Sequence, residues 1–185
     1  MSANKPINLG DPYQTALLII DVQHGLFNKS TPIYQADNLI QNILALVDKA
    51  HQSDTPIVYI QHNDDKYLIK DSLNWQLHPR LQPKPQDLHV FKEHGNAFEQ
   101  TNLGDLLAAA NVGRIVIAGL VTHGCVKSTC LGGLKEGYQV VLAGDTHSSF
   151  SKAAPVLIDK WNKLLAEKGV IVKTTSEISF LKELK

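Results

Sequence analysis

Short apolar runs alternate with amphipathic helical patterns along the whole chain. Continuous runs rich in β-branched residues are typical of strands that are buried on both faces of a parallel sheet. Such runs predict strands at residues 16–20, 57–60, 88–91, 115–118, 139–142 and 170–172. Apolar residues at helical spacing predict helices at residues 37–52, 102–110, 123–136 and 151–168, and glycines follow the last two where a helix is expected to stop.

Strands that alternate with helices predict a parallel sheet with right-handed crossovers and helices on both faces. The stretch 63–87 breaks this rhythm, because it has no clear period and contains Pro79, Pro83 and Pro85. A loop of this length inside a compact domain is usually functional, for instance as the wall of a substrate pocket. No repeat or interdomain linker is visible. We therefore expect one domain over residues 1–185, with a core from about 15 to 175.

Composition narrows the classes of partner. The chain of 185 residues is 43% apolar, and its 18 basic and 18 acidic residues balance. This balance gives no electrostatic reason to expect nucleic acid or an anionic membrane as a partner, so a small-molecule substrate is expected. The polar start lacks the pattern of a signal peptide, and no apolar stretch is long enough to span a bilayer. Cys125 and Cys130 form no Cys-x-x-Cys pair, which favours a reducing cytoplasm.

Three polar residues follow predicted strands at their carboxyl ends, namely Asp21, Lys92 and Cys125. Ligands of open parallel sheets bind at this edge, so the three side chains could form a nucleophilic hydrolase site. Asp21 would act as general base, while Lys92 and a helix start at Cys125 would lower the pKa of the thiol. Each residue alone has an ordinary alternative: a cap or turn aspartate, a solvated lysine, or a core cysteine.

The segments LLIIDVQHGLF, VFKEHGNAF and GLVTHGCVKSTCLGGLKEGYQVVLAGD resemble those of the isochorismatase-like cysteine hydrolase family, which includes nicotinamidases and N-carbamoylsarcosine amidohydrolases. The resemblance runs from about Thr15 to Ser149 and implies that Asp21, Lys92 and Cys125 are the catalytic triad. It also implies a three-layer α/β/α, Rossmann-like fold with strand order 3-2-1-4-5-6 and a homo-oligomer, either a dimer or a tetramer. In that order Lys92 is on the edge strand and must lean back across the sheet.

The same resemblance implies a cis peptide between Leu120 and Val121. The backbone N–H groups of Val121 and Cys125 would then form an oxyanion hole, and losing one such donor costs about a hundred- to a thousandfold in rate. Tentative substrate contacts, for which packing or capping is the alternative, are Gln23, Phe27, His62, Trp75, Thr122 and His123.

One departure concerns metal binding. Nicotinamidases of this family bind a divalent metal through an Asp-x-His pair and a further histidine. In this chain Ile60 stands where that aspartate would precede His62, so we expect no metal and no cofactor. The predicted function is cysteine-dependent hydrolysis of a small carboxamide, carbamoyl or related C–N substrate through a thioester. The alternatives are a vinyl-ether hydrolase of the isochorismatase type and a non-catalytic member of the fold that binds a small molecule.

Overall fold

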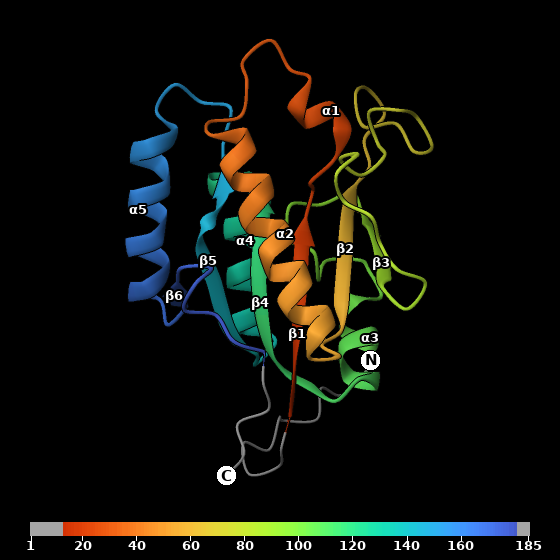
Figure 1. Cartoon of the computed structure of the whole chain (residues 1–185), viewed down its shortest axis with the longest axis vertical. Coiled ribbons are helices and arrows are strands. Elements are labelled where there is room, and N and C mark those ends of the chain that lie inside the picture. Colours follow the sequence, from red (N-terminus) through yellow and green to blue (C-terminus); the bar gives the residue numbers. More distant parts are fainter. Residues whose placement is uncertain (1–12, 181–185) are drawn as a thin grey trace.

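The computed structural model describes residues 13–180, and within them one parallel sheet lies between two layers of helices (Figure 1). The strand order is β3-β2-β1-β4-β5-β6, which confirms the predicted order. The strands are β1 (Gln14–Ile20), β2 (Ile57–His62), β3 (Leu88–Lys92), β4 (Val112–Leu120), β5 (Gln139–Ser148) and β6 (Ile171–Lys173). Residues 1–12 and 181–185 of the expected domain lie outside the described part of the chain.

The helices follow the predicted pattern, except that one predicted helix is divided into two elements. They are α1 (His24–Phe27), α2 (Ala36–Gln52), α3 (Leu103–Ala109), α4 (Lys127–Lys135) and α5 (Ala154–Glu167). The expected helix at 123–136 begins instead with a π-helical turn, η1 (Thr122–Val126), in which Gly124 is non-helical with φ −109° and ψ −114°. Cys125 therefore lies in this turn and not in the first turn of α4. Helix α1 was not predicted because four residues are too few to show a helical period.

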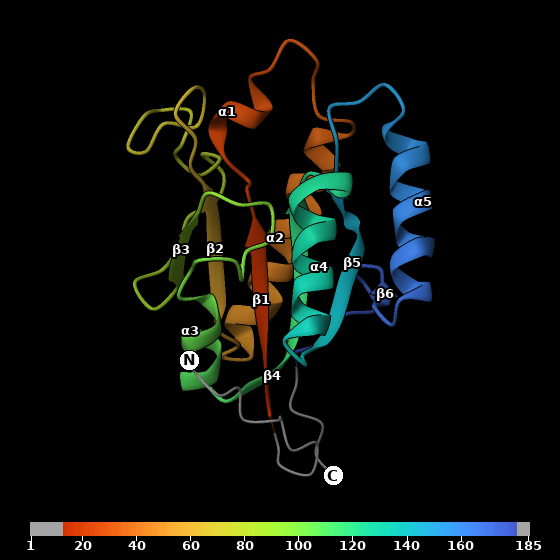
Figure 2. The ribbon, with the colours of Figure 1, turned by 180° about the vertical axis from the view of Figure 1, so that it is seen from behind.

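The inner strands of the sheet are buried on both faces, which explains their continuous apolar runs. Helix α2 covers one face (Figure 1), and α3 and α4 cover the other (Figure 2). Leu17 and Ile19 of β1 pack toward α2, whereas the alternate residues Leu18 and Ile20 pack with side chains of α3, α4 and α5. Since successive side chains of a strand point to opposite faces, both sets are apolar.

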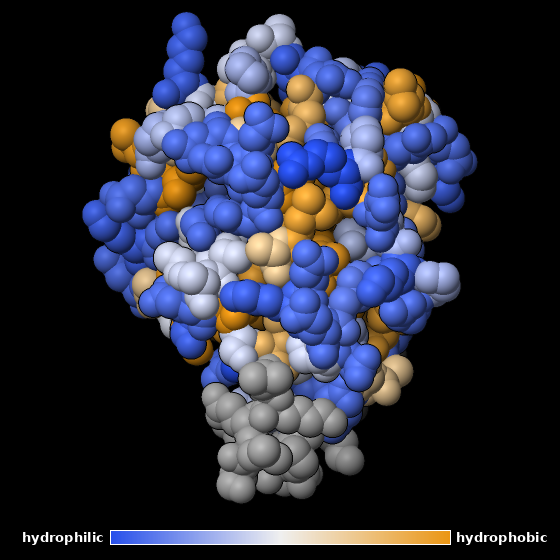
Figure 3. All heavy atoms as spheres, in the orientation of Figure 1, coloured by the Kyte–Doolittle hydropathy of each residue, from blue (hydrophilic) through white to orange (hydrophobic). Residues whose placement is uncertain are grey.

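The outer surface is mainly hydrophilic on the side of α2, with small, separated apolar areas between the polar side chains (Figure 3). Within residues 13–180, no helix combines the length and the apolarity that crossing a membrane requires.

Gly119, the next-to-last residue of strand β4, permits a close approach to β1. Its φ is +125°, and a Cβ added there would lie 2.0 Å from the carbonyl oxygen of Ile20. We expect Gly119→Ala to lower the free energy of unfolding by about 2–5 kcal/mol, because backbone strain adds to overpacking against β1. Urea denaturation measures this loss.

Gly137 provides the matched control for that variant. It also has a positive φ, +89°, but nothing lies within 4 Å of an added Cβ. Gly137→Ala should therefore cost about 1–2 kcal/mol, from backbone strain alone. Equal losses in the two variants would contradict the close contact between Gly119 and Ile20.

Candidate active site

Asp21, Lys92 and Cys125 are brought together at the carboxyl edge of the sheet. Asp21 directly follows β1 and has a left-handed backbone with φ 51°, a conformation that aspartate tolerates better than most residues. Lys92 is the last residue of β3, and Cys125 belongs to η1, which follows β4. The parallel strands end at one edge, so three residues far apart in sequence meet there.

The ammonium group of Lys92 reaches from the edge strand β3 across β2 to Asp21. The distance from Nζ to Asp21 Oδ2 is 2.8 Å, and the side chains of Lys92 and Asp21 are 0% and 4% exposed. A buried ion pair is strongly destabilised when one partner is removed, because the other charge is then uncompensated. Oδ1 of Asp21 is also buried and has no hydrogen-bond partner within residues 13–180. This oxygen is free to accept a proton.

The thiol of Cys125 is protonated in the resting site. A ring nitrogen of His62, a carboxylate oxygen of Asp21 and Sγ of Cys125 all lie within 4.8 Å of one another. Burial, followed by the negative charge of Asp21, raises the pKa of Cys125 to about 12, and the opposing effect of Lys92 is smaller. The expectation of a lowered pKa is therefore wrong, since it counted the helix start and Lys92 but not burial.

This protonation state predicts how the thiol reacts with iodoacetamide. Only the thiolate is alkylated, so the rate for Cys125 should rise about tenfold per pH unit from about pH 7 to 10 without levelling near about 8.5, the value of a free thiol. Peptide mass spectrometry separates Cys125, which is partly exposed, from the buried Cys130. A plateau below about pH 8.5 would contradict the assigned protonation state.

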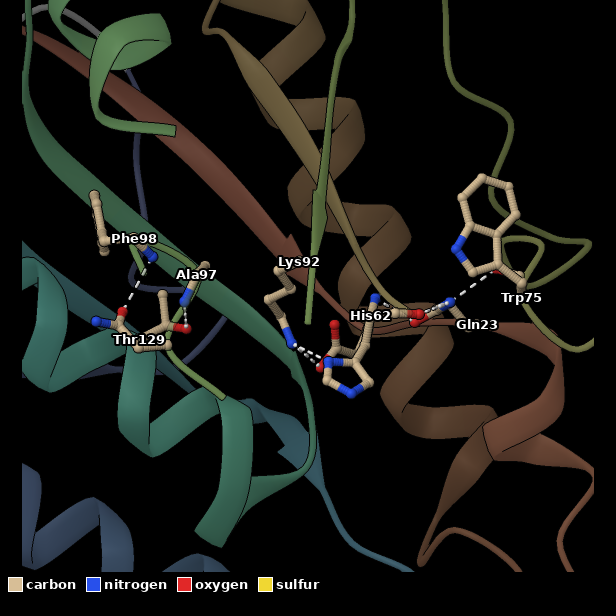
Figure 4. Close-up of polar contacts among 9 residues, drawn as sticks. Gln23, His62, Trp75, Lys92, Ala97, Phe98 and Thr129 are labelled. Atoms are coloured by element: carbon tan, nitrogen blue, oxygen red, sulfur yellow. Dashed lines mark hydrogen bonds and ion pairs between the residues drawn. The ribbon is translucent and has the colours of Figure 1, made fainter. Parts of the chain in front are cut away.

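His62, at the end of β2, is held in one tautomer by Lys92. Its Nδ1 lies 3.2 Å from Lys92 Nζ (Figure 4). An ammonium group can only donate, so Nδ1 is the acceptor and the proton is on Nε2. Burial, and then the positive charge of Lys92, lower the pKa of His62. The imidazole is therefore neutral at pH 7 and offers its Nε2–H as a donor on the side away from Lys92.

Gln23 fixes the backbone of His62. Its Oε1 accepts from the N–H of His62 at 2.8 Å, and its Nε2 donates to the carbonyl oxygens of His62 at 3.0 Å and of Trp75 at 2.8 Å. Figure 4 shows Gln23 between these two residues. The side chain is fully buried, and a buried amide needs all of these partners. Gln23 thus holds the loop against the end of β2, and both polar atoms of its amide bond to backbone groups.

The other tentative contact residues occupy different positions. Phe27 is partly buried and packs against the ring of His78, with a centroid distance of 4.5 Å. Thr122 is buried and bonded to His147, whereas His123 is exposed. The ring of Trp75 lies 5.2 Å from that of Phe91. Sequence patterns missed the pairing of Thr122 with His147, because nothing in the local order of residues shows that β5 continues to Ser148.

A cavity of about 670 Å³ opens beside His62. It is formed by the start of the loop 63–87 and by the end of β3, and His62 is the one tentative contact residue in its lining. This volume is within the range of small-molecule sites. The lining residues are His62, Asn63, Asp64, Asp65, Lys66, Ile69, Lys70 and Glu93. Because both signs of charge are present, the cavity suits a polar ligand. As predicted, the stretch 63–87 contains no helix and no strand of the sheet.

The donor atoms of Asp21, His62 and Cys125 are close enough to surround a metal ion. However, the ammonium group of Lys92 already bonds to Asp21 and to His62, at 2.8 and 3.2 Å. A cation among these donors would face that positive charge at short range. Ile60, where the Asp-x-His pair of nicotinamidases has its acid, is fully buried. The residues therefore do not fit that metal centre, and no chemical step is assigned to a metal.

Fold and site together define a Rossmann-like α/β protein with a buried aspartate–lysine pair beside a cysteine. A family model of the isochorismatase domain matches residues 15–163. The chain therefore belongs to the isochorismatase family. The peptide bond between Leu120 and Val121 is cis.

Three known proteins illustrate the range of similarity. A streptothricin hydrolase of Streptomyces noursei is 29% identical over 147 residues, which cover 78% of this chain and 58% of that protein. The chain thus spans little more than half the length of this curated relative. A crystal structure of an isochorismatase family protein superposes with a TM-score of 0.82 at 29% identity, covering 86% of this chain and 98% of the other. The N-carbamoylsarcosine amidase of Thermoplasma acidophilum, with a TM-score of 0.78 at 20% identity and coverage of 89% and 98%, shows the fold alone.

Proposed function

We propose that this protein is a cysteine-dependent hydrolase of small carboxamide, carbamoyl or related C–N substrates. The observation that carries the proposal is the buried ion pair of Asp21 and Lys92 within reach of the Cys125 thiol. An acceptor oxygen, a fixed positive charge and a nucleophile close together are the groups that acyl transfer requires. The activity of one relative, a streptothricin hydrolase, supports this class of reaction.

The first half of the proposed reaction forms a thioester. Because the resting thiol is protonated, Asp21 takes its proton as Sγ of Cys125 attacks the substrate carbonyl carbon. The backbone N–H groups of Val121 and Cys125 would stabilise the oxyanion. The C–N bond then breaks, and the leaving nitrogen takes the proton from Asp21. Throughout, Lys92 keeps a positive charge beside the carboxylate, which limits the cost of burying negative charge.

The second half hydrolyses the thioester. Asp21 removes a proton from water, the resulting hydroxide attacks the thioester carbon, and the C–S bond breaks. The departing sulfur recovers the proton, which returns Cys125 to its neutral form. One water is consumed, and one carboxylic or carbamic acid and one amine or ammonia are released. The neutral His62 donor lines the cavity and would bind an acceptor atom of the substrate.

A panel of substrates tests the proposal. Streptothricin, N-carbamoylsarcosine, nicotinamide and isochorismate are incubated with the full chain, and ammonia or amine release and loss of substrate are measured by mass spectrometry. We expect C–N cleavage of at least one of the first three and no turnover of isochorismate. Cleavage of isochorismate alone, or binding without any turnover, would overturn the assigned reaction.

A further inference from the structure

Strand β5 has an irregularity beside the nucleophile. Ile117 of β4 pairs with Leu142, but Gly119 pairs with His147, so β5 carries extra residues between these two positions. Such bulges re-aim side chains and are frequent next to active sites. Here the bulge places His147, which is 3% exposed, in contact with Thr122 of the turn that carries Cys125.

His147 is the middle of a chain of hydrogen bonds. Its Nδ1 lies 2.9 Å from Oγ1 of Thr122, and its Nε2 lies 2.8 Å from Oδ1 of Asn162 in α5. Nδ2 of Asn162 donates to the carbonyl oxygen of Gly144 at 3.1 Å. These hydrogen bonds therefore connect η1, β5 and α5 through the buried side chains of Thr122 and His147 and the partly buried side chain of Asn162.

These contacts fix the proton on each atom. Asn162 donates through Nδ2, so its Oδ1 is the acceptor that faces His147, and Nε2 of His147 must carry a hydrogen. Burial lowers the pKa of His147, which keeps the ring neutral and leaves a lone pair on Nδ1. The hydroxyl of Thr122 then donates to Nδ1. A threonine that is held this way has one orientation, and the turn is fixed with it.

We propose that His147 is a positioning residue, which acts through Thr122 to hold the turn of Cys125 in its reactive place. The part of this proposal that concerns turnover rests on the proposed hydrolase function. Thr122 directly follows Val121, whose carbonyl oxygen accepts from the N–H groups of Gly124 at 2.9 Å and of Val126 at 3.4 Å. Displacing catalytic groups by about 1 Å can cost about a hundredfold in rate.

Variants of Thr122 test the contact. Thr122→Val keeps the shape and removes the hydroxyl, so we expect amide hydrogen exchange of Gly124 and Val126 to become about tenfold faster. Turnover of the amide that the wild type cleaves best should fall about 10- to 100-fold, with KM changed less than about threefold. Thr122→Ser retains the donor and should restore both. Thr101→Val removes a hydroxyl that bonds to the backbone of Ala97 and Leu103, and should leave both unchanged.

Two variants of His147 distinguish its hydrogen bond with Thr122 from its hydrogen bond with Asn162. Asparagine places an amide oxygen near the position of Nδ1 and keeps an acceptor for Thr122, whereas glutamine places its amide near Nε2 and keeps the contact with Asn162. We expect His147→Asn to retain most of the turnover and the slow exchange, and His147→Gln to resemble Thr122→Val. The reverse order would contradict a role through Thr122.

Nitrogen-15 NMR of the imidazoles gives a result that does not depend on activity. The wild-type signal of His147, assigned by its loss in His147→Asn, should show a protonated Nε2 and a bare Nδ1 at pH 7. A protonated Nδ1, or wild-type exchange and turnover in Thr122→Val, would overturn the proposal. If the wild type cleaves no amide, the proposed function fails, while exchange and the NMR spectrum still decide the positioning role. If Thr122→Val does not fold, hydrogen exchange and the NMR spectrum of Thr122→Ser and of the wild type still decide the positioning role.

Discussion

Replacing Cys125 with alanine is expected to lower the turnover of a cleaved amide by about 10⁴- to 10⁶-fold, the range found when a catalytic nucleophile is removed. Without Sγ no thioester can form, and the protonated partner of Asp21 is lost. Stability should change little, because the side chain is partly exposed and the backbone turn is kept. Initial rates with substrate at saturation measure the effect.

Cys130→Ala is the matched control. Cys130 is fully buried against the sheet, outside the proposed site of Asp21, Lys92 and Cys125, and it lies only five residues farther along the chain. Its loss should affect stability and leave kcat within about threefold of the wild-type value, since large effects on rate need contact with the reacting atoms. A Cys125→Ala protein that keeps a tenth or more of its activity would point to hydrolysis without a thiol, as in the vinyl-ether alternative.

Lys92→Met is expected to have the largest effect on stability. The variant leaves the carboxylate of Asp21 buried without its partner, which typically costs about 3–5 kcal/mol. Turnover should also collapse, because no positive charge balances the negative charge that Asp21 and the reacting sulfur carry. Urea denaturation and initial rates report the two losses separately.

The double variant Asp21→Asn with Lys92→Met separates charge balance from catalysis. With no buried charge left uncompensated, it should recover most of the lost free energy of unfolding but none of the activity. Lys163→Met is the control for an exposed ion pair, because Lys163 and Asp159 are 71% and 68% exposed. That change should cost less than about 1 kcal/mol. A Lys92→Met protein as stable as this control would contradict the buried ion pair.

Much of the fold was predictable because it depends on short-range patterns. All six strands fall at predicted positions. The four inner strands are mostly buried, and a strand that is buried on both faces must be apolar along its length. Strand ends were less predictable. The run at 139–142 extends to Ser148 through the bulge, where polar residues such as Thr146 and His147 are buried. Their burial depends on partners in other elements, and no local period shows it.

The candidate site was predictable to the extent that parallel strands share one carboxyl edge. This rule placed Asp21, Lys92 and Cys125 in one region, and the structure brings them into contact. The environment of each group was not predictable. The raised pKa of Cys125 follows from how deeply the thiol is buried and how near Asp21 lies, and both depend on packing.

The sequence by itself determined the layers, the order of chemistry-bearing residues and the edge at which they lie, because hydrophobic periodicity and chain connectivity act locally. The tertiary structure decided which atoms meet. It turned Lys92 back across β2, used Gln23 and Thr122 to hold the backbone and the nucleophile turn, and kept the thiol neutral. Hydrogen bonds and pKa values depend on distances of a few ångströms between distant segments, and only the packed chain sets these distances.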